Sequence, residues 1–232
     1  MLRAVILAGG EGKRLAPYTT VLPKPLMPVG ERPILEILIR RLRSAGVRNV
    51  TLAVGHLASL IMAYFGDGER FGIEIDYSLE DKPLGTAGPL RLVKDLGEPF
   101  FVMNGDLLTD IDFSAMARAH QSSDALATVG VFQRDLKIDL GVVETENGRV
   151  TGYIEKPTHR FLVSMGIYVL DPSVVESIPQ DRPFDLPELV TGLISSGDHV
   201  ASYEHRGYWL DIGRPEDYER AQLDLETIAL DL

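Results

Sequence analysis

Short apolar runs alternate with amphipathic segments along the first part of the chain, and this alternation limits the fold more than any other feature of the sequence. Residues 4–8 form a continuous apolar run that ends at two glycines, and residues 33–45 carry apolar side chains at helical spacing. Strands that alternate with helices build a parallel sheet covered on both faces. The chain is therefore predicted to have an α/β fold with a doubly wound, mostly parallel sheet.

The pattern changes after about residue 130. Residues 141–143 and 149–154 flank Asn147-Gly148, a dipeptide typical of tight hairpin turns, so we expect a small antiparallel insertion there. No internal repeat or linker is visible, which predicts a single domain over residues 1–232. The other expected strands are residues 50–54, 73–77, 99–103, 125–132, 164–170 and 208–212, and the other expected helices are 57–65, 113–120, 186–195 and 215–230.

Composition excludes several classes of protein. The chain has 232 residues and no cysteine, so it holds neither disulfides nor thiolate metal sites. Its formal charge of −11 disfavours binding to nucleic acid. No apolar run approaches the length of a membrane span, so we expect a cytoplasmic protein with no membrane partner. The final predicted helix could serve a homodimer contact through Leu223, Leu225, Ile228 and Leu230.

A glycine-rich loop follows the first predicted strand. Glycines at 9, 10 and 12 would let backbone N–H groups approach phosphate oxygens, and Arg14 could neutralise those oxygens. Leu15 stands where the dinucleotide-binding fingerprint needs its third glycine, and Arg14 stands where the common NTPase loop needs serine or threonine. Taken alone, the loop could equally be a tight turn between a strand and the next segment.

Two charged residues add to this pattern. Lys24 lies between two prolines, and a cation on a stiff backbone near a glycine loop suits a leaving pyrophosphate, although a surface lysine would look the same. Asp106 follows the predicted strand at 99–103, at the strand end where ligands bind in open α/β sheets. A carboxylate there can hold Mg²⁺, which prefers oxygen ligands.

Together, residues 8–15 and 22–26 resemble the opening of the sugar-1-phosphate nucleotidylyltransferase family. That family carries glycine-glycine-x-glycine-x-arginine-leucine and then proline-lysine-proline, and residues 80–88, 104–106, 155–157 and 209–213 also fit it. The resemblance implies a Rossmann-like, glycosyltransferase-A-like sheet and an Mg²⁺-dependent enzyme. Such an enzyme joins a nucleoside triphosphate to a sugar 1-phosphate and releases pyrophosphate. This chain departs from the pattern at Lys13, where many members have threonine, and at Leu107, where many have asparagine.

The resemblance also implies a role for each matching residue. Arg14 and Lys24 would stabilise the departing pyrophosphate, and Asp106 and Asp211 would hold Mg²⁺. Lys156 would hold the attacking sugar phosphate. The remaining residues implied in substrate binding are Ala8, Gly9, Gly10, Gly12, Glu80, Gly85, Thr86, Gly141 and Glu155, of which Glu155 would bind sugar hydroxyls.

The substrates are less constrained than the class of reaction. Residues 83–88 most resemble guanylyltransferases of mannose 1-phosphate and heptose 1-phosphate, which favours GTP. UTP, dTTP and CTP stay open, as does a catalytically silent regulatory subunit that keeps the fold and binds nucleotide sugar. A nicotinamide-dependent dehydrogenase is disfavoured, because Leu15 replaces the glycine that such enzymes need.

Overall fold

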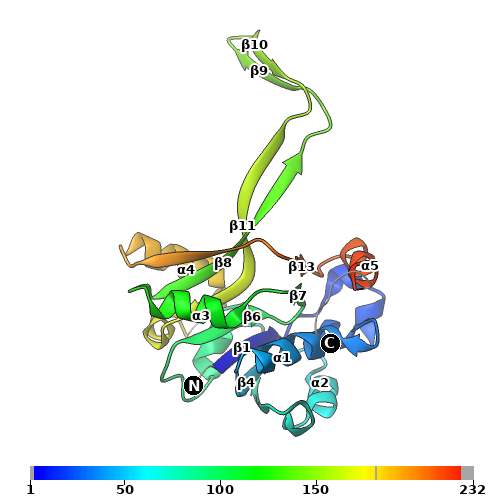
Figure 1. The fold of residues 1–232 in the computed structure, drawn as a ribbon, viewed down its shortest axis with the longest axis vertical. Coiled ribbons are helices and arrows are strands. Elements are labelled where there is room, and N and C mark those ends of the chain that lie inside the picture. The colour runs from blue at the N-terminus through cyan, green and yellow to red at the C-terminus, as the bar shows by residue number, and fades with distance from the viewer. Residues whose placement is uncertain (1–2, 181, 226–232) are drawn as a thin grey trace.

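A seven-stranded sheet forms the centre of the molecule (Figure 1). The computed structural model describes residues 3–180 and 182–225. The strand order is β12-β8-β11-β6-β1-β4-β5, and β11 alone runs antiparallel to its two neighbours. The strands are β1 (Arg3–Ala8), β4 (Asn49–Val54), β5 (Glu74–Leu79), β6 (Phe100–Asn104), β8 (Ala127–Lys137), β11 (Thr158–Leu170) and β12 (Val200–His205).

Helices cover both faces of this sheet. Ala4 and Ile6 of β1 belong to one core cluster and Val5 to another, because successive side chains of a strand point to opposite faces. The first cluster is completed by α1 (Ile34–Ser44), α2 (Ala58–Phe65) and α3 (Phe113–Gln121), and the second by α4 (Leu186–Ser195). The predicted α/β, doubly wound and mostly parallel fold is thus confirmed.

Three two-stranded sheets complete the fold: β2 (Pro28–Val29) with β3 (Arg32–Pro33), β7 (Leu107–Thr109) with β13 (Trp209–Asp211), and β9 (Val142–Glu146) with β10 (Arg149–Ile154). The β9–β10 hairpin turns at Asn147 and Gly148, which both have positive φ, and it confirms the predicted antiparallel insertion. α5 (Pro215–Asp224) packs beside β13 in a third core cluster. The rest of the helix predicted over 215–230, with Ile228 and Leu230, lies outside the described residues.

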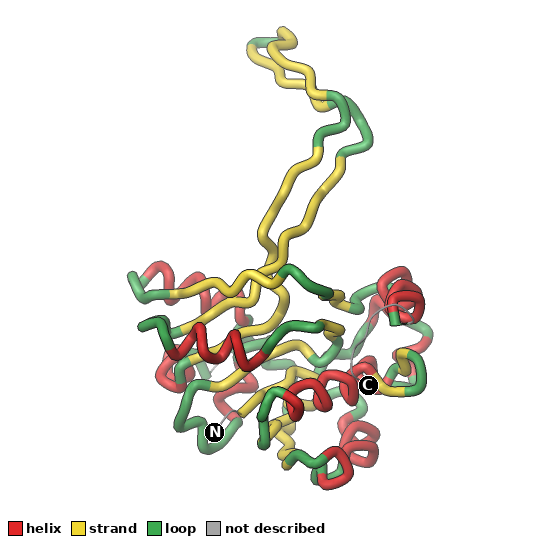
Figure 2. Tube along the Cα trace, in the orientation of Figure 1, coloured by secondary structure: helices red, strands yellow, loops and turns green. Residues whose placement is uncertain are grey.

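Two strands are longer than predicted. One was predicted to end at residue 132, whereas β8 continues to Lys137, and another was predicted to begin at residue 164, whereas β11 begins at Thr158. The side chains of both extensions are exposed. The apolar pattern that predicted the strands therefore ends earlier than the backbone pairing of the two strands. Figure 2 shows both strands leaving the sheet as a ribbon that ends in β9 and β10.

The directions of the strands decide at which edge of the sheet a ligand can bind. β1, β4, β5, β6 and β8 all run the same way, so their carboxyl ends lie at one edge of the sheet. In open α/β sheets this edge is where ligands bind. None of the helices in the described residues has the length and apolar character that crossing a lipid bilayer requires.

Candidate active site

A cleft of about 820 Å³ opens at the carboxyl ends of β1, β4 and β6. A volume of this size suits a ligand as large as a nucleotide. Gly10 borders open space, which leaves room for a ligand against the glycine loop. Most of the predicted site residues line this cleft, namely Ala8, Gly9, Gly10, Gly12, Arg14, Lys24, Glu80, Gly85, Thr86 and Asp106.

Two carboxylates lie near each other at one end of the cleft. Asp106 lines the cleft, whereas the predicted Asp211 does not, although Gly213 two residues later does. Asp106 lies between β6 and β7, and Asp211 ends β13. In the antiparallel pair of β7 and β13, Asp211 is opposite Leu107, and the Ile212 N–H donates to the Asp106 carbonyl at 3.1 Å. The backbone therefore fixes Asp211 next to Asp106, although the two are far apart in sequence.

Both negative and positive groups surround the carboxyl group of Asp211. The pKa of the Asp211 carboxyl is raised, first by burial and then by the negative charge of Asp106, while Lys24 and Arg14 act in the opposite direction. Lys24 is only 8 % exposed, and its ammonium forms an ion pair with Asp106 Oδ2. The site thus holds two acidic groups close together with cations beside them.

A divalent cation would fit between these groups. Asp106 Oδ1 is buried and has no hydrogen-bond partner among the described residues. No cluster of three or more His, Asp or Glu side chains suited to a metal occurs in the described part of the chain. Mg²⁺ is commonly held by one or two carboxylates, with water and substrate phosphates as its other ligands. Asp106 and Asp211 are therefore of the kind that could hold Mg²⁺ together with water and substrate phosphates, and the Mg²⁺ site stays a prediction.

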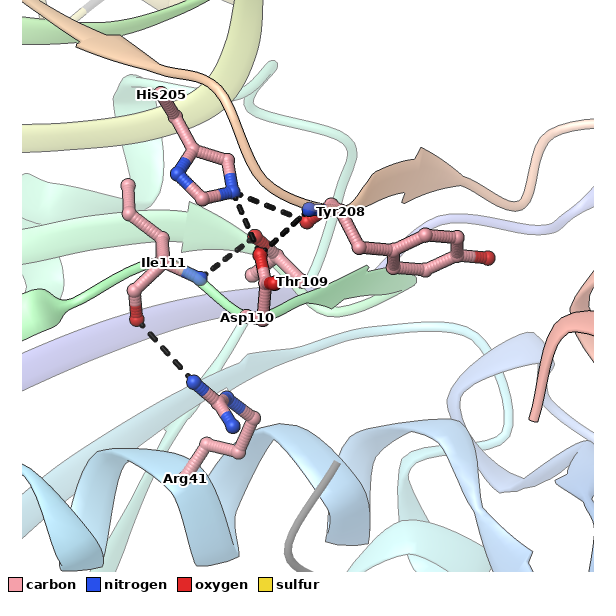
Figure 3. A network of polar contacts seen from close by, with 6 residues as sticks. All are labelled: Arg41, Thr109, Asp110, Ile111, His205 and Tyr208. Atoms are coloured by element: carbon pink, nitrogen blue, oxygen red, sulfur yellow. Dashed lines mark hydrogen bonds and ion pairs between the residues drawn. The ribbon is translucent and has the colours of Figure 1, made fainter. Parts of the chain in front are cut away.

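A second polar network secures the segment that leads into β13 (Figure 3). Asp110 Oδ1 accepts a hydrogen bond from the Tyr208 N–H at 2.6 Å and lies 2.8 Å from His205 Nε2. The Trp209 indole N–H donates to the Met165 carbonyl at 3.0 Å and so ties β13 to the central sheet. Sequence analysis missed Asp110 and His205 as positioning residues, because only the fold brings them together.

The glycine loop brings Arg14 to the same end of the cleft as the two carboxylates. Arg14 belongs to the single turn at Lys13–Leu15, and its guanidinium lies against Gly213, two residues beyond Asp211. Lys13, which replaces a common threonine, is exposed and pairs with Glu11 at 2.8 Å. Leu107, which replaces a common asparagine, is buried in the apolar core and offers no polar group to a ligand.

Glu80 lies deeper in the cleft. Its Oε2 accepts the Leu84 N–H at 3.1 Å, and burial raises the pKa of its carboxyl, an effect that this hydrogen bond opposes. A Cβ at Gly9 would lie 2.7 Å from Glu80 Oε1. A larger residue at position 9 would therefore displace the Glu80 carboxylate from its present place in the cleft.

The segment with Gly85 and Thr86 has a structural partner that sequence analysis missed. Asp185 Oδ1 accepts hydrogen bonds from the Thr86 N–H at 2.8 Å and the Thr86 hydroxyl at 3.1 Å, and the same hydroxyl accepts the Leu186 N–H at 2.8 Å. Gly85 has φ +79°, and a side chain there would strike the Phe184 carbonyl. Thr86 thus fastens this segment to the start of α4. Asp185 with Glu188 three residues later matches a helix-start signature, which could have identified it.

Three predicted site residues lie elsewhere. Gly141 precedes β9, and Glu155 and Lys156 follow β10, so all three are on the projecting ribbon (Figure 1). None of them lines the cleft. In the isolated chain the structure does not bring them together with the other site residues, and their roles stay predictions.

Comparison with known proteins gives consistent matches. A family model described as nucleotidyl transferase matches residues 3–228. A mannose-1-phosphate guanyltransferase beta-B of Xenopus laevis is 37% identical over 227 residues, which cover 94% of this chain and 62% of the relative. A UTP–glucose-1-phosphate uridylyltransferase of Synechocystis is 35% identical over 242 residues, with 95% and 62% covered. The chain thus spans 62% of the length of each of these relatives.

Among solved structures, a candidate glucose-1-phosphate thymidylyltransferase from Bacillus anthracis, in complex with sucrose, superposes with a TM-score of 0.81 at 25% identity. The match covers 98% of this chain and 96% of that one. This similarity agrees with the fold described above.

The raised pKa of Asp211 gives a stability prediction for the metal-free protein. A carboxyl whose pKa is higher in the folded state loses its proton at a cost to stability. That cost is absent below the unfolded pKa of about 3.9 and grows as pH rises to the folded pKa. Asp211→Asn should therefore raise the thermal midpoint in EDTA at pH 7.5, by roughly 2–4 °C for each kcal/mol of repulsion removed.

The measurement is a set of melting curves from pH 3.5 to pH 7.5. The gap between Asp211→Asn and the unmutated protein should close at the acidic end. Asp198→Asn, which removes an exposed carboxylate, serves as the matched control and should leave the midpoint unchanged. A lower midpoint for Asp211→Asn at pH 7.5 would contradict this account of the carboxylate pair.

Proposed function

The chain belongs to the nucleotidyl transferase family, and on this premise we propose that it joins a nucleoside triphosphate to a sugar 1-phosphate and releases pyrophosphate. The observation that carries the proposal is the cleft in which the glycine loop, Lys24 and Asp106 meet at the carboxyl end of β6, with Asp211 close to Asp106. Backbone N–H groups and cations suit a triphosphate, and a carboxylate pair suits its magnesium ion.

The chemistry is a displacement at the α-phosphorus of the nucleotide. An oxygen of the sugar phosphate forms a bond to this phosphorus as the bond to the β-phosphate oxygen breaks, and pyrophosphate carries away the electron pair. The attacking phosphate is already ionised at neutral pH, so no strong general base is needed. Two anions must nevertheless approach each other, so catalysis consists of positioning and charge neutralisation.

Residues of the cleft divide this work. Arg14 and Lys24 would stabilise the charge that builds up on the departing pyrophosphate. Asp106 and Asp211 would hold Mg²⁺, which when bound neutralises phosphate charge and polarises the phosphoryl group. Lys156 would neutralise the attacking phosphate and Glu155 would bind sugar hydroxyls, with Gly141 as a backbone contact.

GTP is the nucleotide that we favour. Guanine presents an N1–H and a 2-amino group side by side, and both are donors. Glu80 is a half-buried carboxylate in the cleft, and one of its oxygens is not committed to Leu84, so it can accept from such an edge. Uracil and thymine present a single N–H between two carbonyl groups, which a carboxylate matches less well. The favoured sugar 1-phosphates are of the mannose or heptose type, and the guanyltransferase relative supports the former.

The direct test is release of pyrophosphate by the purified chain. GTP, UTP, dTTP and CTP would each be offered with mannose, glucose, N-acetylglucosamine and heptose 1-phosphates, with Mg²⁺ and with EDTA. We expect metal-dependent release with GTP and a mannose- or heptose-type sugar. Release with a different nucleotide would support the proposed reaction but refute the proposed preference for GTP. Nucleotide binding without any release would favour the regulatory-subunit alternative.

Lys24→Ala should lower kcat at least about 10²-fold, the scale seen when one preorganised charge-stabilising group is lost. Asp106→Asn and Asp211→Asn should do the same, because each removes a metal-holding charge. The readout is steady-state pyrophosphate release, and Lys94→Ala, an exposed lysine outside the cleft, is the matched control. Turnover near that of the unmutated protein in Lys24→Ala would remove Lys24 from the mechanism.

Glu80→Gln should lower kcat/KM for GTP by about 10- to 100-fold, because a hydrogen bond to a charged group contributes roughly 1.5–3 kcal/mol. The value for UTP should change much less, so the preference for GTP should shrink. Glu69→Gln, at an exposed carboxylate outside the cleft, controls for a general loss of negative charge. An equal loss with both nucleotides would mean that Glu80 supports the cleft without reading the base.

A further inference from the structure

A long ribbon projects from the pocket edge of the central sheet, and we call residues 133–162 the arm (Figures 1 and 2). β12 pairs with β8 as far as Phe132, and beyond this residue only β11 pairs with β8. The ladder continues from Gln133 opposite Leu162 to Lys137 opposite Thr158. At roughly 3.3 Å per residue, this part alone extends about 17 Å beyond Phe132. The β9–β10 hairpin lies at its tip.

The arm exposes an unusual amount of apolar surface. Half of the exposed large apolar side chains in the described residues belong to it, namely Leu136, Leu140, Val143, Val150, Tyr153, Ile154, Phe161 and Leu162. Apolar side chains left exposed in such number are typical of an interaction site, and a two-stranded ribbon alone in water is only marginally stable. The arm is therefore expected to be covered by another surface.

The arm also carries the residues that were predicted to bind the sugar phosphate, and the cleft has none of them. The cleft holds groups for a triphosphate and its metal, whereas Glu155 and Lys156, predicted to bind the sugar phosphate, lie on the arm between β10 and β11. On the proposed function the reaction needs both sets of residues in one place. The site of a single chain in this conformation is incomplete.

In this conformation the arm holds Glu155 and Lys156 outside the cleft of their own chain. The β8–β11 pairing is regular from Ser164 to Thr158, and its register shifts between Ser164 and Tyr168 at the foot of the arm. Glu155 and Lys156 lie beyond the last pair of this ladder, which joins Thr158 and Lys137. Delivery to a second molecule requires no change in this ladder.

The body of the molecule offers an apolar surface that could receive an arm. Tyr18, Val21, Met27 and Tyr218 line a hollow beside the glycine loop, and Val21 is 75 % exposed. The Thr19 hydroxyl donates to the Gly12 carbonyl at 2.9 Å, so this segment is fastened to the loop. An arm that covers the hollow would lie next to the cleft.

We propose that two copies of this chain exchange arms, so that each copy delivers Glu155 and Lys156 to the cleft of the other. Each chain has one arm and one cleft, so the exchange is reciprocal and closes as a two-fold dimer. The roles of Glu155 and Lys156 in this dimer rest on the proposed function. The exchange itself rests on the exposed apolar side chains of the arm and on the β8–β11 ladder, regular from Ser164 to Thr158, that carries the arm away from its own cleft.

The first experiment uses two kinds of mixed dimer, made by co-expressing chains with different tags and purifying on both. In one, Lys24→Ala pairs with Lys156→Ala, and each variant alone should have lost at least about 10²-fold in turnover. Arm exchange gives this dimer one cleft built wholly from unmutated residues, so about half of the normal activity should return. If each arm served its own cleft, the dimer would stay inactive, which would overturn the proposal.

The matched control places both substitutions in one chain. The double variant Lys24→Ala/Lys156→Ala is paired with the unmutated chain. Arm exchange predicts an inactive dimer, because one cleft lacks Lys24 and the other receives an arm without Lys156. Arms that serve their own chain would leave this dimer about half active. The two mixed dimers therefore give opposite results under the two arrangements.

The second experiment does not depend on activity. Sedimentation at micromolar concentration should show a dimer, and Leu162→Asp should shift it to monomer while circular dichroism and melting show a folded chain. Ile194→Asp, at an exposed residue of α4, should stay dimeric. A monomeric unmutated protein, or a dimer unaffected by Leu162→Asp, would overturn the exchange. Absence of pyrophosphate release with an arm-dependent dimer would instead refute the proposed function alone.

Discussion

The pairing of two very short strands, β7 and β13, is the contact on which the candidate site depends. Leu107 and Asp211 are opposite each other in this pair, and Ile212 bonds to the backbone of Asp106. Without it, Asp211 would belong to a loop with no fixed relation to β6. Two three-residue strands cannot hold themselves together. Their support comes from Asp110 with the Tyr208 N–H (Figure 3), from Trp209 with Met165, and from the apolar cluster beneath α5.

The same pairing creates electrostatic repulsion. It holds the Asp106 and Asp211 carboxylates close together, and both burial and Asp106 raise the pKa of Asp211. Lys24 offsets part of the repulsion through its ion pair with Asp106, yet Asp106 Oδ1 still has no partner among the described residues. Sites that gather like charges or leave polar atoms unpaired cost stability, and proteins retain them chiefly where a ligand uses them. The geometry thus suits a bound cation better than an empty cleft.

Sequence reasoning succeeded where the signal was local. The apolar run of β1, the glycine loop and the Asn147-Gly148 turn are each contained in a few residues, and the structure has the strand, the loop and the hairpin at those positions. It failed where the outcome depended on tertiary contacts. Periodicity reports burial, so it ended one strand at residue 132, although β8 continues exposed to Lys137. Motif reasoning also missed the partner of Thr86, whose N–H and hydroxyl are engaged with Asp185 and the start of α4, because Asp185 is 99 residues away in the chain.

A site divided between a cleft and an arm has a consequence for binding. On the proposed function, the residues assigned to the triphosphate line the cleft of one chain, so a single chain would bind nucleotide without its arm. Glu155 and Lys156, assigned to the sugar phosphate, lie on the arm and would contribute only when the arm is docked. Since docking covers apolar surface and adds Lys156 beside bound phosphates, nucleotide binding and docking should favour each other through a shared free energy. The same coupling works in both directions, so nucleotide should tighten the association of two chains.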